Sequence, residues 1–491
     1  MAEPESGSPQ GCRFELEGRG VCPLPADAQD GEGYCICHSR NPKKDRNTFE
    51  RITSGRLEAS GDCTGFVFPI DCDFRKRVFK AHSFRNAVFM GATNFHGARF
   101  PSGADFCGAT FVGNANFGNS EFGAPNKGGD ALFCWANFQG EADFSHATFH
   151  GNARFDSGVV AADGTGEPVI TQRTKFVGPA RFVQAVFYGA AAFREAVLGN
   201  RASFARMACI GRADFRRAKF GGEATFIGAT FHEPAAFVGD KQEPVFSVGH
   251  ETDFREVTLL RPHQTEFRHA YLGRARFAGT DVRQVDFTGV IWADRKGRNA
   301  VWDEVGPDLE GEKKDYALIH KLYLRLKQNY EEQRDPITAG DFHYGEIHMR
   351  PMLPRPTRAG VMGWLERNRV WRWLGRKVSF LTLYRWFSGY GESYGRALSW
   401  LVGMWALFAL LFWVRRFGLQ LDNIPAGGEP VQAVRSFWDC LLYSLTCLLP
   451  GVPEPFRPAC AQARWASVAE SIFGPVLIAM FTLALNRRFK R

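Results

Sequence analysis

The feature that most constrains this fold is a series of phenylalanines spaced five or six residues apart. The first run comprises Phe74, Phe79, Phe84, Phe89, Phe95, Phe100, Phe106, Phe111, Phe117 and Phe122, and further runs continue through Phe155 and from Phe176 to Phe237. A helix would scatter residues five apart around its cylinder, and a strand would send alternate ones to opposite faces. Only a coil that turns a corner every five or six residues keeps all the rings inside.

A small residue precedes many of these rings by two positions, as in Ala104-Asp105-Phe106 and Ala115-Asn116-Phe117. Each buried ring removes about 150–250 Å² of surface from water, so a stacked ladder can hold a rod together without a cofactor. We therefore interpret the rings as structural. The predicted solenoid core includes Phe95, Phe100, Phe106, Phe111, Phe117, Phe144 and Phe149.

These Ala-(Asp/Asn)-Phe units resemble the pentapeptide-repeat family over residues 64–296. The resemblance implies a mainly β fold, a right-handed quadrilateral β-helix with the large central residue of each unit stacked indoors. The stretch between Phe155 and Phe176 interrupts the repeat and is predicted to be a loop leaving one corner.

Length and composition fit several units rather than one. The chain has 491 residues, whereas single cores stop growing near roughly 250–300 residues. Its 45 Phe and 52 Gly residues are a compositional bias of the kind that a sequence repeat produces. The first 20 residues lack the apolar stretch of a secretory signal, so we expect the 12 cysteines to be reduced and to face the cytosol.

The segment 1–60 is predicted to hold a zinc ion. Cys12, Cys22, Cys35 and His38 follow the pattern C-x9-C-x12-C-x2-H in a stretch with few apolar residues, and metal binding can supply missing folding energy. Four such ligands suit a closed structural site, with Cys37 able to replace Cys35. The alternative is a disordered reduced tail whose cysteines are incidental.

Charge argues against the known soluble role of some pentapeptide-repeat proteins, which mimic duplex DNA with an acidic face. Residues 65–296 contain 27 Lys and Arg against 23 Asp and Glu, a net charge of about +4. The charges are interspersed along the sequence, so direct nucleic-acid binding is not expected either. The overall charge of +9 also suits the basic flanks of membrane spans.

After Trp292 the periodicity becomes helical, with Ile319, Leu322 and Leu326 on one face. We predict a helical connector over 297–395. Within it, residues 364–387 are rich in Trp and Arg and are interpreted as a segment lying on an anionic lipid surface.

Residues 396–491 are predicted to form a two-span membrane module. The expected spans are Ala397–Val414 and Ala466–Leu485, each long enough to cross hydrocarbon with its edges. Basic residues flank the outer ends of both, which predicts cytoplasmic N- and C-termini. Resemblance to bacterial pentapeptide-repeat membrane proteins implies a multi-pass protein of the bacterial inner membrane.

A short apolar stretch, Ser436 to Thr446, lies between the spans and is too short to cross. This layout resembles a two-transmembrane ion channel with a re-entrant pore helix, and that resemblance implies a homo-oligomer, most plausibly a tetramer. The Thr-x-Gly-Tyr-Gly filter of potassium channels is absent. The pore candidates are Asp439, Thr446, Gly451 and Glu470, with the alternative that Glu470 only reaches toward the interface.

Two functions follow from this layout. In the first, a cytoplasmic solenoid senses or binds a protein partner and the two-span module forms an oligomeric channel-like pore. In the second, the module conducts nothing and anchors the solenoid as a scaffold for protein interaction. We expect no enzyme, because the sequence has no Gly-rich phosphate loop, nucleophile elbow or supported carboxylate pair.

Overall fold

The computed structural model describes residues 11–16, 20–59, 61–80, 82–160, 169–308, 311, 313–353, 386–387, 394–414, 420–425, 427–428, 433, 436–449 and 456–489. The chain divides into two compact units, Met1–Arg334 and Asp335–Arg491. Each unit is described by itself.

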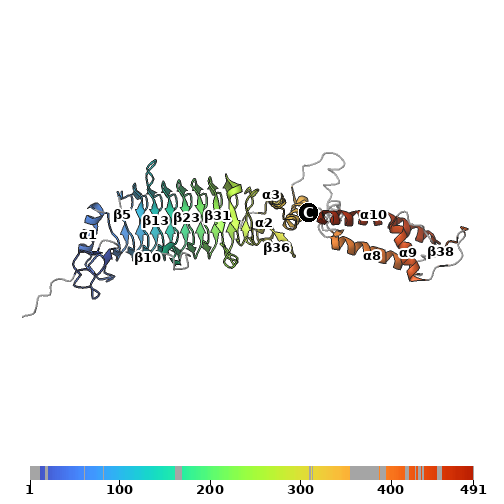
Figure 1. Cartoon of the computed structure of the whole chain (residues 1–491), viewed down its shortest axis with the longest axis horizontal. Helices are drawn as coiled ribbons and strands as arrows, with labels where there is room; N and C mark the ends of the chain where they lie inside the picture. Colours follow the sequence, from blue (N-terminus) through green and yellow to red (C-terminus); the bar gives the residue numbers. More distant parts are fainter. Residues whose placement is uncertain are drawn as a thin grey trace, which may run out of the picture. The chain divides into compact units, whose positions relative to one another are not determined.

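The first unit is built around a solenoid whose short strands stack into four parallel sheets (Figure 1). The first sheet contains β3 (Val67–Phe68), β6 (Val88–Phe89), β10 (Thr110–Phe111), β14 (Asn137–Phe138), β20 (Lys175–Phe176), β24 (Val197–Leu198) and β28 (Lys219–Phe220). The second contains β4 (Cys72–Asp73), β7 (Thr93–Asn94), β11 (Ala115–Asn116), β15 (Ala142–Asp143), β21 (Ala180–Arg181), β25 (Ala202–Ser203), β29 (Ala224–Thr225), β32 (Thr252–Asp253) and β35 (Ala275–Arg276).

The other two sheets complete the four sides. The third contains β8 (Arg99–Phe100), β12 (Glu121–Phe122), β16 (Thr148–Phe149), β22 (Val186–Phe187), β26 (Ala208–Cys209), β30 (Thr230–Phe231) and β33 (Thr258–Leu259). The fourth contains β5 (His82–Ser83), β9 (Ala104–Asp105), β13 (Ala131–Leu132), β17 (Ala153–Arg154), β23 (Ala191–Ala192), β27 (Ala213–Asp214), β31 (Ala235–Val238) and β34 (Glu266–Arg268). A short η1 (Pro262–Gln264) precedes β34.

One full coil takes 22 residues where nothing is inserted, because Val88 pairs with Thr110 and Ala202 with Ala224. This step equals four units of alternating five and six residues. Several corners need a residue with positive φ, and Asn119, His146 and Gln184 adopt it at 56°, 59° and 56°. Such a backbone conformation is uncommon for residues other than Gly, so the regular stacking of the coils must hold it.

The interior is a set of stacked rings. Phe117 lies 4.8 Å from Phe95 and 4.8 Å from Phe144 between ring centroids, nearly parallel to both. The seven predicted core residues are all buried, with at most 1% of any side chain exposed: Phe95, Phe100, Phe106, Phe111, Phe117, Phe144 and Phe149. Offset stacking within a ladder and edge-to-face contacts between ladders are both favourable ring geometries.

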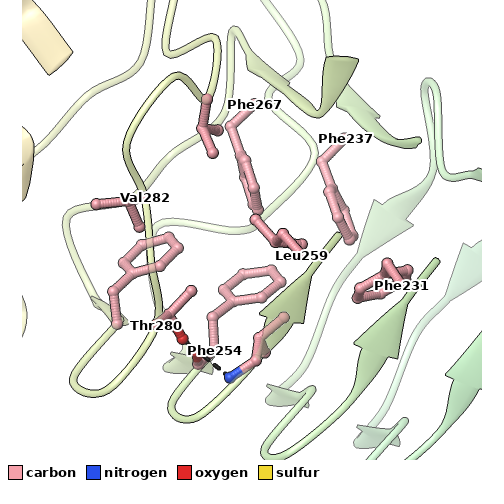
Figure 2. Close-up of a pocket in the computed structure, with 10 residues that line it drawn as sticks. Phe231, Phe237, Phe254, Leu259, Phe267, Thr280 and Val282 are labelled. Atoms are coloured by element: carbon pink, nitrogen blue, oxygen red, sulfur yellow. Dashed lines mark hydrogen bonds between the residues drawn. The ribbon is translucent and has the colours of Figure 1, made fainter. Parts of the chain in front are cut away.

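Packing loosens near the last coils, where aliphatic side chains take the place of rings (Figure 2). Leu259, Val282 and Val285 line a closed apolar cavity of about 10 Å³ beside Phe254. The Thr280 hydroxyl oxygen also enters this region and accepts a hydrogen bond from the Val257 N–H at 2.9 Å. The cavity is at most large enough for one water molecule, so it is a packing defect rather than a ligand site.

The insertion after Phe155 begins and ends as a two-stranded antiparallel hairpin, β18 (Gly158–Val160) and β19 (Val169–Gln172). Residues 161–168 lie outside the described part. The coils on either side remain in register, because Phe138 pairs directly with Phe176. Part of the predicted loop therefore forms its own two-stranded sheet.

The N-terminal end of the solenoid is covered by residues 11–59. They form the hairpin β1 (Glu15–Leu16) and β2 (Gly20–Val21), turns, and helix α1 (Arg46–Ala59). Phe49 of α1 packs edge-to-face on Phe68 of the first coil at 5.6 Å. The described residues 11–16 and 20–59 are therefore a folded cap, not a tail.

The C-terminal end is covered by β36 (Ala293–Asp294), β37 (Asn299–Ala300), α2 (Trp302–Val305) and α3 (Tyr316–Glu332). Asn329 of α3 donates hydrogen bonds to the carbonyls of Val282 and Val285 in the last coil at 2.7 and 2.9 Å. Helix α3 thus belongs to the solenoid unit, whereas the sequence assigned it to the connector. The Phe period ends at the last coil, but the exposed end of the stack still needs a cover.

The second unit is helical. It contains α4 (Pro336–Met349), η2 (Arg350–Met352), α8 (Tyr394–Trp413), α9 (Phe437–Leu448) and α10 (Ala461–Phe489), with a small antiparallel pair, β38 (Leu421–Asn423) and β39 (Phe456–Pro458). Two stretches are long and apolar enough to cross a membrane, Tyr394–Trp413 and Ala461–Asn486. The predicted lipid-surface segment 364–387 lies outside the described residues except for Trp386 and Phe387.

Candidate functional site

The four predicted metal ligands meet in the N-terminal cap. The ligand atoms of Cys12, Cys22, Cys35 and His38 all lie within 4.8 Å of one another, and all four residues are buried. His38 Nδ1 is 3.1 Å from Cys35 Sγ and 3.5 Å from Cys12 Sγ. Cys22 Sγ is 4.0 Å from Cys35 Sγ. The four side chains therefore surround one point, which could hold a metal ion.

Local structure explains how ligands far apart in sequence converge. Cys12 and Cys22 flank the β1–β2 hairpin, where the Cys22 N–H donates to the Phe14 carbonyl at 2.8 Å. Cys35 and His38 bracket a tight turn, closed by the His38 N–H donating to the Cys35 carbonyl at 3.0 Å. A hairpin and a turn facing each other are the usual way to build a four-ligand knuckle.

The orientation of His38 suits a metal ligand. Its Nε2 lies 3.1 Å from the Thr64 carbonyl oxygen, so this nitrogen carries the hydrogen and donates it. Nδ1 then presents its lone pair to the thiols. The ring is fixed by stacking on Phe14 at 4.0 Å. Such a bond on the second ring nitrogen sets the tautomer of a ligating histidine.

The electrostatics of the cluster favour neutral thiols. Burial raises the pKa of Cys22 to about 12 and raises the pKa of Cys12 as well. A hydrogen bond to Cys37, followed by burial, raises the pKa of Cys35. Metal binding would have to displace these protons, which makes affinity depend on pH.

Four ligands close the coordination shell, so the arrangement fits a structural ion and offers no open position for catalysis. Cys37 was predicted as a possible substitute for Cys35. It is buried beside Cys35, but the converging set contains Cys35. Lys44, a buried residue close to the cluster, was not predicted, because a single lysine in a basic stretch has no distinguishing pattern.

The second unit has a polar core where α8, α9 and α10 pack together. Trp405 Nε1 donates to the Leu441 carbonyl at 3.0 Å, and the Ser444 hydroxyl lies 3.2 Å from the Trp405 carbonyl oxygen. The Tyr443 and Ser467 hydroxyls are 2.8 Å apart. These bonds join α9 to α8 and to α10.

Glu470 lies at the centre of this polar core. Its side chain is fully buried and accepts a hydrogen bond from Ser444, while its second carboxylate oxygen has no hydrogen-bond partner among the described residues. The alternative in which Glu470 reaches out to the interface is wrong for this unit, because the packed helices enclose it. Ser444 was missed in the sequence, since a serine in an apolar helix is a common residue.

The other pore candidates lie elsewhere. The Thr446 hydroxyl is buried and donates to the Tyr443 carbonyl at 2.7 Å within its own helix. Asp439 is half-buried in the first turn of α9, and the described part of the chain does not include Gly451. Among the described residues, Glu470 is hydrogen-bonded to Ser444 and not to Asp439 or Thr446.

Aromatic side chains gather near both ends of α8. Trp413 lies at one end, 5.8 Å from Phe437, and Trp400 lies near the other, 5.0 Å from Trp386. Tyr394 and Trp413 are about 29 Å apart at 1.5 Å per residue, close to the roughly 30 Å of bilayer hydrocarbon. Aromatic belts at this spacing are typical of a spanning helix. Helix α9 is about 18 Å long by the same rise, too short to cross.

Three comparisons with known proteins bear on these features. The sequence model described as "Pentapeptide repeats (9 copies)" matches residues 77–121. The search for related curated proteins returned no match, and neither did the search of solved structures. The match lies within the coils that contain β8, β10 and β12.

Proposed function

We propose that this chain, a solenoid containing pentapeptide repeats joined to two helices able to span a membrane, is a channel-like membrane protein. In this proposal the solenoid binds or senses a protein partner in the cytoplasm, and the two-span module assembles into an oligomeric pore. The observation that carries the proposal is the position of α9, a short apolar helix packed against both long helices.

A helix too short to cross, held between two that can, is the arrangement of a re-entrant pore helix. Two spans enclose no pore alone, so conduction requires several copies, and four is the number favoured by resemblance to two-span channels. The proposed setting is a bacterial inner membrane, with both termini cytoplasmic and anionic lipid against the basic segment 364–387. The solenoid is proposed to be right-handed.

The second candidate is a non-conducting scaffold that displays the solenoid as an interaction surface. It is favoured by Glu470, whose side chain is buried and hydrogen-bonded to Ser444 within one chain rather than exposed to a path. Neither candidate assigns an enzymatic step to the chain.

Ion flux separates the two candidates. Liposomes containing the full-length protein are compared with liposomes containing a version that ends before Ala397. Flux confined to the full-length form, and altered by Glu470→Gln, supports the channel. Tight liposomes with both forms support the scaffold, provided that the full-length protein is shown to be inserted.

We also propose that the cluster of Cys12, Cys22, Cys35 and His38 holds one structural Zn²⁺. Three thiols and an imidazole around one buried point are the ligands that zinc prefers. Metal analysis of the full-length protein should find one zinc per chain. Less than half an equivalent after purification without chelators would refute zinc as the resident ion.

A further inference from the structure

Lys44 is an unusual feature of the N-terminal cap because its ammonium group is buried. Only 4% of the residue is exposed. Its three hydrogens are all used, since Nζ donates to the carbonyls of Ile36, Ser39 and Val67 at 2.9, 3.0 and 2.6 Å. Among the described residues, no carboxylate forms an ion pair with it. Its hydrogen bonds are satisfied, but its charge is not.

An unpaired charge in a protein interior is costly, and buried lysines are normally paired. The carbonyls of Ile36 and Ser39 belong to the turn that carries Cys35 and His38. The ammonium therefore lies against the ligand turn itself. Burial lowers the pKa of Lys44 to about 8, and the groups whose charge opposes this shift are, in decreasing effect, Cys37, Cys35, Asp27 and Asp30. The cysteines outweigh the two carboxylates, so the balancing charge is sought chiefly in the metal centre.

A centre that holds a zinc ion supplies the negative charge that balances Lys44. A divalent zinc ion, three thiolates and a neutral imidazole carry a net charge of about −1. His38 is held in the neutral tautomer that donates to Thr64, which agrees with this count. One ammonium cation balances one such anion.

Lys44 also connects the ligand turn to the solenoid. The carbonyl of Val67, in the first coil, accepts from Lys44, and the N–H of Val67 donates to the Cys37 carbonyl at 2.8 Å. Phe49 of α1 lies 4.4 Å from the ammonium nitrogen and adds a cation–π contact. One side chain thus contacts the ligand turn, the first coil and the capping helix.

We infer that Lys44 is the counter-charge of an anionic metal–thiolate centre. Through its hydrogen bonds it also couples metal binding to the packing of the ligand turn against the first coil. This inference rests on the proposed zinc site. Lys44 is a positioning residue and not a ligand, because its nitrogen is occupied by three carbonyls.

The test measures zinc affinity of the full-length protein in detergent by competition with a chromophoric chelator. Lys44→Met should weaken zinc binding by about 10–100-fold, the usual effect of losing an outer-shell partner. Lys43→Met is the matched control, since Lys43 is the exposed neighbour, and it should leave the affinity unchanged.

A double-mutant cycle separates charge from simple support of the fold. Cys22→His makes the ligand set neutral when zinc is bound, so Lys44→Met should then cost little, within about twofold. Equal losses in both backgrounds, including failure of both variants to fold, would show that Lys44 acts only through its hydrogen bonds and would overturn the inference. An unchanged affinity in the wild-type background would overturn it too.

The same measurement distinguishes the inference from the proposal on which it rests. A wild-type protein without zinc defeats the zinc site itself. A wild-type protein with one zinc, whose affinity does not respond to Lys44→Met, defeats only the role of Lys44.

Discussion

At the N-terminal end of the solenoid the first coil is covered by residues 11–59, which converge on three cysteines and a histidine. At the C-terminal end the last coil is covered by helix α3 and a network of hydrogen bonds. Both covers protect the end of an aromatic stack, Phe68 by Phe49 and Phe287 by Trp292. They differ in what holds the cover itself together.

The C-terminal cover depends on a buried carboxylate. Glu304 accepts from Arg298 at 2.8 Å and is also bonded to Arg295 and Tyr323. Helix α3 is long and amphipathic, so it brings its own apolar face to the last coil. The N-terminal cover has a single 14-residue helix and many turns. A segment with so little apolar surface needs another source of stability, and ligand convergence indicates a metal.

The largest effect is expected from loss of a ligand of the proposed metal site. Cys35→Ser should unfold the cover at residues 11–59, because structural zinc contributes about 10 kcal/mol or more to small zinc domains. Hydrogen exchange should rise across residues 11–59 and stay low in the coils around Phe117. Cys72→Ser, at a cysteine outside the cluster, is the control. Equal protection in both variants would show that the cover does not depend on metal.

The second largest effect is expected at the C-terminal end of the solenoid. Glu304→Gln leaves Arg298 and Arg295 without their buried counter-charge, which should destabilise the C-terminal cover by about 3 kcal/mol. Hydrogen exchange in α2 and α3 reports the change. Glu332→Gln, at an exposed position, should have no effect. If Glu304→Gln also leaves hydrogen exchange in α2 and α3 unchanged, the charge network does not stabilise the C-terminal cover.

A smaller effect is expected at Asn329. Replacing it with Ala removes the side-chain donor of the Val282 carbonyl and one of the two donors of the Val285 carbonyl, which keeps Gln333 at 3.2 Å, so the cost should be about 1–2 kcal/mol. Amide exchange should increase in the last coil and in α3 but not in residues 11–59. Faster exchange at both ends would mean that the two covers are coupled through the solenoid.

The smallest effect is expected from a change in packing at the N-terminal end of the solenoid. Phe49→Leu removes the edge-to-face contact with Phe68 while keeping an apolar side chain, so the loss should be about 1 kcal/mol. Zinc content should remain at its wild-type value. A loss of zinc from this variant would show that packing, rather than ligand geometry, positions the cluster.

Much of the first unit could be predicted from the sequence. The spacing of rings such as Phe95 and Phe117 required a coil with inward-facing aromatics, and the structure has stacked parallel strands there. The cysteine and histidine spacing also named the four residues that converge. Helix α1 was not predicted, because its sequence combines a Gly and several polar residues with no clear apolar face.

The sequence by itself determined the solenoid, since a repeat places every ring by the same local rule. It also indicated four residues that could hold a metal ion and two stretches long and apolar enough to span a membrane. Only the tertiary structure decided that Lys44 links the cluster to the first coil and that Glu470 is enclosed beside Ser444. These contacts join residues far apart in sequence and occur once each. A unique long-range contact leaves no periodic signal, whereas a repeated local one does.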